Sequence, residues 1–311
     1  MGYYADTWRD MIMKVLLFGG TKHVVTIELI NQLKRKNIPF VMVTNEKRNN
    51  LFCDYPLFII NNRQELIDLL IEQKIDKVIH LWNTDITTNS SKDSFQESEE
   101  NIERTVDLLE ACVEAKVKKI IFPSTISVYG NISEEKITEE SLTIPVLFEG
   151  LSKKIEEQYI KNYHSMYGLS YSILRFSTLY GNSVIKEDLI KSTIHKILVG
   201  NTPILFENGE EKKEFLYITD AVNAIIYSLD KGDNEIINLS GDFKISTKEI
   251  VEFIEMYIKK KVSKSLEGEK SNISIEKAKK YLGWEAAFSM EEGIIHIIKN
   301  LLHDYKYEEV Q

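Results

Sequence analysis

The sequence predicts an α/β fold, in which a doubly wound parallel sheet is followed by a smaller C-terminal α/β lobe. Short apolar strands alternate with amphipathic helices through the first half of the chain. The chain also opens with an apolar strand, a Gly19-Gly20 turn and a helical pattern that starts at Thr26. After Gly181 the regular alternation of strand and helix ends, and helices mix with short strands. The first two observations are typical of a Rossmann-type sheet, and the third indicates a second, smaller lobe.

The apolar spacing predicts each element of the sheet in turn. Strands are expected at Lys14–Phe18, Phe40–Thr44, Leu57–Ile60, Lys77–Trp82, Lys119–Pro123 and Ser170–Arg175. Helices are expected from Thr26 through Leu33, at Gln64–Gln73, in a longer run ending near Ala115, and at Lys153–Tyr167. Repeated strand–helix–strand units imply right-handed crossovers, so a ligand is expected at the carboxyl ends of the strands.

The rest of the chain is expected to form mainly a lobe that binds substrate. Its expected helices are Leu189–Val199, Asp220–Asp230, Lys248–Lys260, Ile275–Leu282 and Met290–Asp304, and its expected strands are Ile204–Phe206, Glu214–Tyr217 and Ile236–Asn238. The predicted organisation is therefore an N-terminal extension at 1–12, a dinucleotide-binding domain at 13–181 and the lobe at 182–311, with some segments returning to the first domain.

Composition excludes several classes of function. The 311 residues carry a net charge of −9, which argues against an extended surface for nucleic acid. No apolar run approaches the length of a membrane span, and residues 1–12 do not resemble a signal peptide. The two cysteines and six scattered histidines suggest neither a disulfide framework nor a metal site, and Cys112 and His80 are expected in the core. A cytoplasmic protein is expected.

Four motifs carry the chemistry. They are FPSTISVYG at 122–130, EGLSK at 149–153, LRFSTLYG at 174–181 and EFLYITD at 214–220. Together with Asn101, NLSG at 238–241 and SIEKAKKYLGW at 274–284, these segments resemble the extended short-chain dehydrogenase/reductase family. More narrowly, they resemble its nucleotide-sugar epimerases and dehydratases. The resemblance covers nearly the whole chain from Met13.

The resemblance implies a site that oxidises a sugar hydroxyl with bound NAD or NADP. Thr125 matches the residue that hydrogen-bonds the reacting hydroxyl, and Lys153 matches the lysine that holds the nicotinamide ribose and lowers the pKa of a tyrosine. This sequence has Glu149 where that tyrosine is expected. A carboxylate is a weaker base than an activated phenol, and it is expected to pair with Lys153. Glu149 therefore implies either an altered redox step or a lost one.

The dinucleotide site that the resemblance implies has lost several of its usual residues. Its expected members are Gly19, Gly20, Thr21, Lys22, His23, Val24, Thr44, Asn45, Leu81, Trp82, Asn83, Lys153 and Phe176. Lys22 and Val25 stand where the second and third glycines of the turn are expected. Thr44-Asn45 takes the place of the acid that grips the ribose in NAD-selective members, so NADP or no cofactor becomes plausible beside NAD. Trp82 either fills the cofactor groove or stacks elsewhere.

The implied substrate site includes Thr125, Thr178 and Lys213. Thr178 stands where relatives often carry an asparagine near the nucleotide phosphates, and Lys213 where many carry an arginine for the diphosphate. The alternative for Lys213 is a place in a surface triplet with Glu211 and Lys212. Tyr129 and Tyr180 are expected to be packing residues.

Three functional hypotheses remain open. The first is an NAD(P)-dependent epimerase or dehydratase acting on a UDP- or dTDP-sugar, with Glu149 giving it unusual acid–base chemistry. The second is an inactive or re-purposed member that binds nucleotide sugar, dinucleotide or a protein partner. A more remote third follows from GGTK at 19–22, which resembles atypical members with RNA-related roles. The family commonly forms homodimers through the long helix before Lys119 and the helix after Lys153, so a homodimer is also expected.

Overall fold

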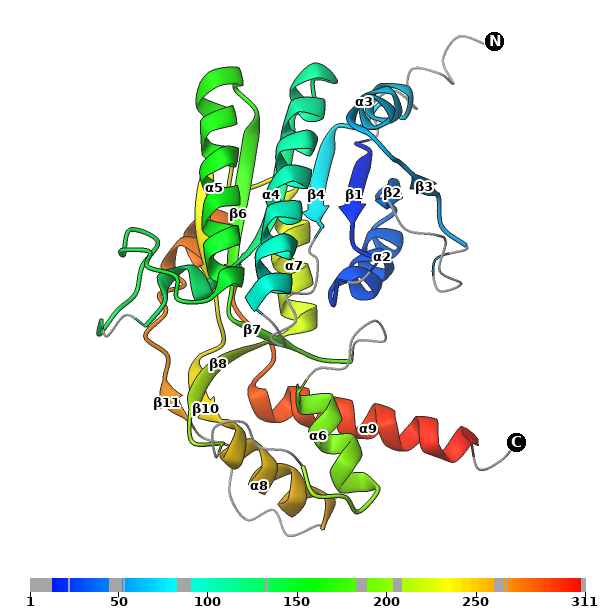
Figure 1. Ribbon diagram of the computed structural model, residues 1–311. Helices are drawn as coiled ribbons and strands as arrows, with labels where there is room; N and C mark the ends of the chain where they lie inside the picture. The colour runs from blue at the N-terminus through cyan, green and yellow to red at the C-terminus, as the bar shows by residue number, and fades with distance from the viewer. Residues whose placement is uncertain are drawn as a thin grey trace.

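A seven-stranded parallel sheet organises the larger part of the molecule. The computed structural model describes residues 13–21, 23–44, 52, 54–82, 91–131, 134–182, 189–203, 209–259, 266 and 268–308. The strands lie in the order β3-β2-β1-β4-β5-β6-β9, and every neighbouring pair is parallel (Figure 1). Their bounds are β1 Val15–Gly19, β2 Phe40–Thr44, β3 Leu57–Ile59, β4 Lys77–Leu81, β5 Lys119–Thr125, β6 Ser170–Phe176 and β9 Glu235–Leu239. This architecture confirms the predicted α/β fold class.

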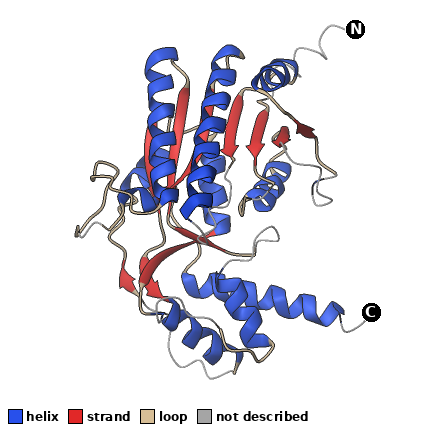
Figure 2. Ribbon diagram, in the orientation of Figure 1, coloured by secondary structure: helices blue, strands red, loops and turns tan. Residues whose placement is uncertain are grey.

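Helices cover both faces of this sheet because its strands are apolar on both sides. One face packs against α2 (Thr26–Arg35) and α7 (Ile218–Ser228). The other packs against α3 (Arg63–Glu72), α4 (Ser91–Glu114) and α5 (Phe148–Tyr167). Figure 2 shows the strands enclosed between these layers. The layers leave the carboxyl edge of the sheet to face the second lobe.

The smaller lobe is built around a second sheet with the strand order β11-β10-β8-β7. Its strands are β7 Thr178–Tyr180, β8 Lys212–Tyr217, β10 Phe243–Ser246 and β11 Glu269–Lys270. Its helices are α6 Leu189–Leu198, α8 Thr247–Ile258 and α9 Met290–Glu308, and they share one apolar core with β8 and β10. A short π-helical segment, η4 (Ala278–Leu282), packs instead against the main sheet. No helix in the described part of the chain has the length and apolarity to cross a bilayer.

Several elements differ from the sequence expectations. Helix α5 begins at Phe148, five residues before the predicted start at Lys153. Its first turn contains Gly150, a poor helix former, but a Cβ there would lie 2.5 Å from the carbonyl oxygen of Ser127, so the glycine allows a close approach. The strands β7, β10 and β11 were not predicted, and the strand expected at Ile204–Phe206 lies outside the described residues. β9, expected in the lobe, pairs with β6 in the main sheet.

Candidate functional site

The glycine turn after β1 packs directly against the end of β4. Gly19 and Gly20 have φ values of +79° and +91°, a region that side chains rarely adopt. A Cβ on Gly19 would lie 2.7 Å from the Cα of Trp82, and one on Gly20 would lie 3.0 Å from the side chain of Leu81. Both glycines are therefore required by the turn itself. Leu81 is a core residue beneath the turn.

The N-terminus of α2 follows this turn, and its hydrogen bonds form without the second and third glycines of the expected motif. The hydroxyl of Thr26 donates to the carbonyl of Gly20 at 2.6 Å, and the N–H of Val25 donates to Nδ1 of His23 at 3.4 Å. Val25 carries no side-chain cap for the helix and is fully buried in the core. Its side chain therefore replaces the missing glycine by packing inward. Val24 is partly buried against the same core, and Lys22 lies outside the described residues.

The end of β2 carries a hydroxyl group in place of the acid typical of NAD-selective members. Thr44 is buried, and its Oγ1 lies 3.5 Å from Oγ1 of Thr21 in the glycine turn. The two hydroxyls join β2 to the turn. Asn45 lies outside the described residues.

Trp82 packs beneath α4. Its ring lies 5.4 Å from that of Phe18 between centroids, and the guanidinium of Arg104 lies 5.2 Å from its centroid. It belongs to the core on the face covered by α3, α4 and α5. The Trp82 ring therefore packs on other side chains, and its place in the cofactor groove stays a prediction. Asn83 is outside the described residues.

Thr125 ends β5 and caps the short 3-10 helix η2 (Ile126–Tyr129). Its Oγ1 accepts a hydrogen bond from the N–H of Ser127 at 3.1 Å and lies 3.0 Å from the Ser127 hydroxyl. The side chain is only partly buried. Thr125 therefore has the predicted position at the carboxyl edge, and it also has a structural role as a cap.

The expectation that Glu149 pairs with Lys153 is wrong. Glu149 is exposed in the first turn of α5, and its side chain forms no hydrogen bond or ion pair with any residue that the structure describes. Lys153 is only 7% exposed, and its Nζ lies 3.3 Å from Oε2 of Glu156 and 4.6 Å from the centroid of Phe122. The helix directs Lys153 towards the sheet, where Glu156 is on the same buried face.

Glu156 is the centre of a buried polar cluster that the motifs did not predict. Its carboxylate accepts hydrogen bonds from Thr105 at 2.8 Å and from Ser152 at 3.1 Å. The Thr105 hydroxyl also lies 2.7 Å from Nε2 of His80. Burial, and secondarily the charge of Lys153, lowers the pKa of His80 well below its ordinary value, so this imidazole is neutral. His80 is a core residue, as expected, and Cys112 is likewise buried.

A second buried cluster joins β5, α5, β6 and β9. Glu157 accepts from Arg175 at 2.6 and 3.0 Å and from Ser124 at 2.6 Å. Arg175 also donates to the hydroxyl of Tyr129 at 2.9 Å, and that hydroxyl donates to Asn238 at 2.7 Å. Tyr129 therefore does more than pack. Burial raises its pKa, which keeps the phenol protonated as a donor.

Helical spacing contains a signal for these missed glutamates. Residues 156 and 157 lie four and three positions before Ile160, a fully buried residue of α5. Both therefore fall on the face of the helix that packs against the sheet. A pair of acids on that face requires buried partners.

The expected substrate residues lie on two neighbouring strands of the lobe. Thr178 is exposed at the start of β7, and Lys213 lies on β8, which pairs with β7. Lys213 is half exposed and forms a 2.8 Å ion pair with Glu211, as in the surface alternative. Phe176 ends β6 in the core, and Tyr180 is buried in the core of the lobe.

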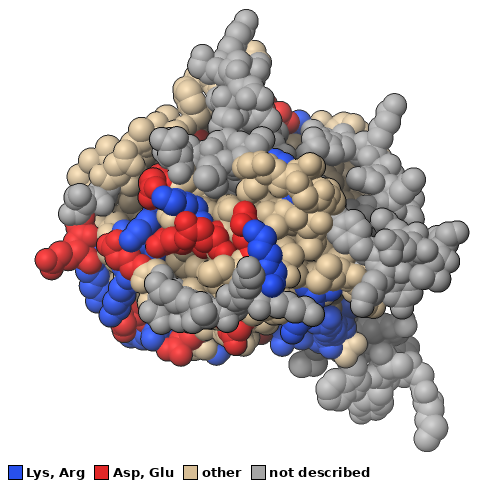
Figure 3. Space-filling view, turned by 90° about the horizontal axis from the view of Figure 1, so that it is seen from below, with Lys and Arg blue, Asp and Glu red and all other residues tan. Residues whose placement is uncertain are grey.

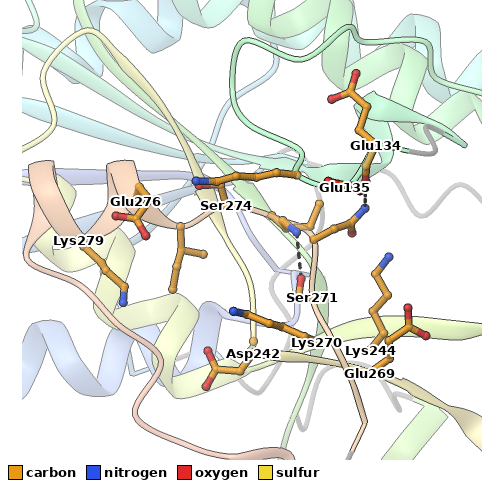
Figure 4. Close-up of a pocket in the computed structure, with 15 residues that line it drawn as sticks. Glu134, Glu135, Asp242, Lys244, Glu269, Lys270, Ser271, Ser274, Glu276 and Lys279 are labelled. Atoms are coloured by element: carbon orange, nitrogen blue, oxygen red, sulfur yellow. Dashed lines mark hydrogen bonds between the residues drawn. The ribbon is translucent and has the colours of Figure 1, made fainter.

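A separate cavity of about 670 Å³ lies beside β10, β11 and the segment before η4. Acidic and basic side chains line it together, among them Asp242, Lys244, Glu269 and Lys270 (Figure 4). Acidic and basic side chains are likewise mixed over the underside of the molecule (Figure 3). None of the predicted site residues lines this cavity. Among the described residues, no group of three His, Cys, Asp or Glu side chains forms a metal site.

Comparisons with known proteins agree with this architecture. Residues 24–240 match the model of the NAD dependent epimerase/dehydratase family. The chain is 31% identical over 309 residues to UDP-glucuronate 4-epimerase from Thermodesulfobacterium geofontis, with 94% of each chain covered.

Solved structures give the same fold. UDP-glucose 4-epimerase from Thermotoga maritima, solved with UDP-glucose, superimposes with a TM-score of 0.82 at 23% identity, covering 94% of this chain and 100% of that one. UDP-glucuronic acid 4-epimerase from Bacillus cereus, solved with UDP-glucuronic acid and NAD, gives a TM-score of 0.78 at 27% identity, covering 93% and 100%. The chain belongs to the NAD-dependent epimerase/dehydratase family, as its resemblance to extended short-chain dehydrogenases/reductases predicted.

Proposed function

We propose that this protein binds NAD or NADP and acts on a UDP- or dTDP-linked sugar by transient oxidation, as an epimerase or dehydratase with atypical acid–base chemistry. One observation carries the proposal. The glycine turn, Thr125 and the first turns of α5, with Glu149 and Lys153, all lie at the carboxyl edge of one parallel sheet. That edge is where such folds bind dinucleotides. The substrates named for the related epimerases support the sugar nucleotide.

The residues present fit a dinucleotide. The turn at Gly19 and Gly20 keeps its tight geometry. The N–H groups of Val25 and Thr26 donate to His23, at 3.4 and 3.1 Å, so a phosphate would be held by the N–H groups that follow them in the first turn of α2. The hydroxyls of Thr21 and Thr44 replace the ribose-gripping acid, which removes the charge that disfavours a 2′-phosphate. A bound nicotinamide would supply the acceptor for a hydride from the sugar carbon.

The remaining roles belong to residues of this chain. The Thr125 hydroxyl hydrogen-bonds the reacting sugar hydroxyl, and Glu149 accepts its proton as an exposed carboxylate. A carboxylate is a weak base because its ordinary pKa lies far below 7. Thr178 and Lys213 approach the sugar nucleotide from β7 and β8. Two copies of the chain associate through α4 and α5.

A second candidate is a member that binds these ligands without turnover. The observation that favours it is the ion pair between Lys153 and Glu156. This pair engages the Lys153 ammonium, which the oxidation of a sugar requires. The two candidates share the binding site and differ only in the chemical step.

The test measures cofactor first and turnover second. The purified protein is denatured and assayed for released NAD(H) and NADP(H), and both are titrated into the stripped protein. Turnover of UDP-glucuronic acid, UDP-glucose and dTDP-glucose is followed by NMR. We expect Thr125→Val to lower turnover at least tenfold, whereas Thr125→Ser, which keeps the hydroxyl and the cap, retains most of it. Ligand binding without turnover supports the second candidate. No binding at millimolar dinucleotide would overturn both.

A further inference from the structure

Two glutamates flank Lys153 on α5, and only one of them contacts it. Glu149 precedes it by four residues and Glu156 follows it by three, both spacings that place side chains within reach on a helix. Nζ of Lys153 lies 3.3 Å from Oε2 of Glu156, and Glu149 forms no ion pair within the described part of the chain. Lys153 therefore pairs with the buried carboxylate of Glu156 and not with the exposed carboxylate of Glu149.

Burial explains this selection. Glu156 is 0% exposed, so its charge must be balanced within the protein, whereas water solvates the carboxylate of Glu149. Hydrogen bonds from Thr105 at 2.8 Å and Ser152 at 3.1 Å supply neutral donors, and Lys153 supplies the positive charge.

Among the described residues, Glu156 is the one charged group that lies within ion-pair distance of Lys153. The groups that face Lys153 are His80 from β4, which burial keeps neutral, and the ring of Phe122 from β5. Lys153 and Glu156 thus form a closed pair with no net charge.

We propose that Glu156 is a positioning residue, which holds the Lys153 ammonium in a neutral buried pair and so removes its electrostatic influence from position 149. The inference deepens the proposed function, on which it rests for the assignment of position 149 to the reacting site. An ion pair acts on its surroundings as a dipole, and its field falls off faster than that of a free cation. The environment of position 149 then depends on Glu156.

This link makes restoring the tyrosine insufficient by itself. In Glu149→Tyr, the phenol faces a neutral pair and is expected to titrate near its ordinary pKa of about 10. In the double variant Glu149→Tyr/Glu156→Gln, Lys153 loses its counter-charge, so the ammonium acts on position 149 as a single cation. The phenol is then expected to titrate lower by about 1 unit or more, as beside a nearby cation.

The experiment is an ultraviolet phenolate titration of the full chain without cofactor or substrate. Glu149→Phe, alone or with Glu156→Gln, is the matched blank that subtracts the 15 native tyrosines. Adding Lys153→Met to the double variant should abolish the shift. Glu149→Tyr/Glu99→Gln, which removes an exposed negative charge on α4, should titrate like Glu149→Tyr. Equal midpoints with and without Glu156→Gln would overturn the proposal. Because no ligand is present, this result is independent of the proposed function.

A second measurement uses the native site and does not need the introduced phenol. Lys153 is expected to react slowly with an amine-directed reagent in the wild type, and at least severalfold faster in Glu156→Gln, as mass spectrometry of the labelled peptide would show. Thermal unfolding of Glu156→Gln is recorded in parallel, with labelling done well below its transition. An unchanged labelling rate in the folded variant would contradict a holding role for Glu156.

Discussion

Asp220 is a buried carboxylate in the first turn of α7 that holds the segment before α9. Its Oδ2 accepts from the N–H of Phe288 at 3.0 Å, and its backbone carbonyl accepts from the indole N–H of Trp284 at 2.9 Å. Oδ1 is buried and has no hydrogen-bond partner among the residues in the described ranges. Burial raises the pKa of Asp220 above its ordinary 3.8, against the opposing effect of the backbone hydrogen bonds. The ionised form is therefore less stable in the folded protein than in the unfolded chain.

This shift predicts a pH-dependent gain in stability for Asp220→Asn. A raised folded pKa means that the folded state binds the proton more tightly, so the wild-type free energy of unfolding falls as pH rises from about 4 through the folded pKa. The asparagine keeps an oxygen acceptor for Phe288 and never ionises. Relative to wild type, the variant should therefore gain stability across that window and hold the gain above it.

Urea unfolding at a series of pH values between 4 and 8 measures this difference. Asp242→Asn, at an exposed position, controls for the loss of a surface negative charge. A difference between Asp220→Asn and wild type that stays flat or decreases with pH would contradict the assignment.

At the residue scale, the motifs predicted the positions of Thr125 and Lys153 but not the partner of Lys153. The choice between Glu149 and Glu156 depends on which side of α5 faces the sheet, and that in turn depends on where the helix begins. The sequence motif EGLSK was expected to open the helix, but it did not show which side of that helix faces the sheet, and so did not show which acid is buried. Glu157 and Arg175 were missed for a related reason, because their pairing joins α5 to β6 across 18 residues.

Gly130 joins η2 to the segment that precedes α5. Its φ is +68°, and a Cβ there would lie 1.9 Å from the carbonyl oxygen of Ile144. Gly168, at the C-terminus of α5, has a similar φ of +75° but no atom within 4 Å of its Cβ position. The two glycines therefore differ in two ways: ψ is −147° at Gly130 and 12° at Gly168, and only Gly130 has atoms close to its Cβ position.

Gly168→Ala is expected to cost about 1–2 kcal/mol, because only the left-handed conformation penalises the alanine. Gly130→Ala is expected to cost more, because the ψ of −147° at Gly130 lies outside the left-handed region, in a conformation essentially restricted to glycine that costs other residues about 1–3 kcal/mol. An overpacking cost of about 1–3 kcal/mol is added to this. Urea unfolding of both variants measures the difference. Equal losses for the two variants would show that the segment around Ile144 moves aside freely.

At the element scale, prediction succeeded where the strands are buried on both faces. Such strands read as continuous apolar runs, and β2 was predicted with the bounds observed. β11 consists of Glu269 and Lys270, so no apolar signal distinguishes it from a loop. β9 was recognised as a strand but was expected in the lobe, because pairing with β6 is a long-range contact that local periodicity does not encode.

At the scale of the whole molecule, α5 presents an apolar stripe to solvent. Leu151, Tyr159 and Met166 are 43%, 39% and 69% exposed, and their spacings of about two helical turns place them on one face. α4 lies beside α5 on the same side of the sheet, and its Phe95 is also exposed (Figure 1). Large apolar side chains exposed on two adjacent helices are suited to association.

If two copies pair through these helices, Met166→Glu should convert a dimer into a monomer, because it places a charge in the apolar stripe of both copies. Sedimentation velocity across a concentration series gives the mass of each species. Leu302→Glu, at a position on α9 that is 44% exposed, introduces the same charge away from α4 and α5 and should leave the dimer intact. A wild type that sediments as a monomer, or a dimer that survives Met166→Glu but not Leu302→Glu, would rule out this face as the interface. α5 also carries Glu149, Lys153 and Glu156, so a dimer formed here would help to hold these site residues in position. Turnover measured on Met166→Glu would then fall together with dimerisation.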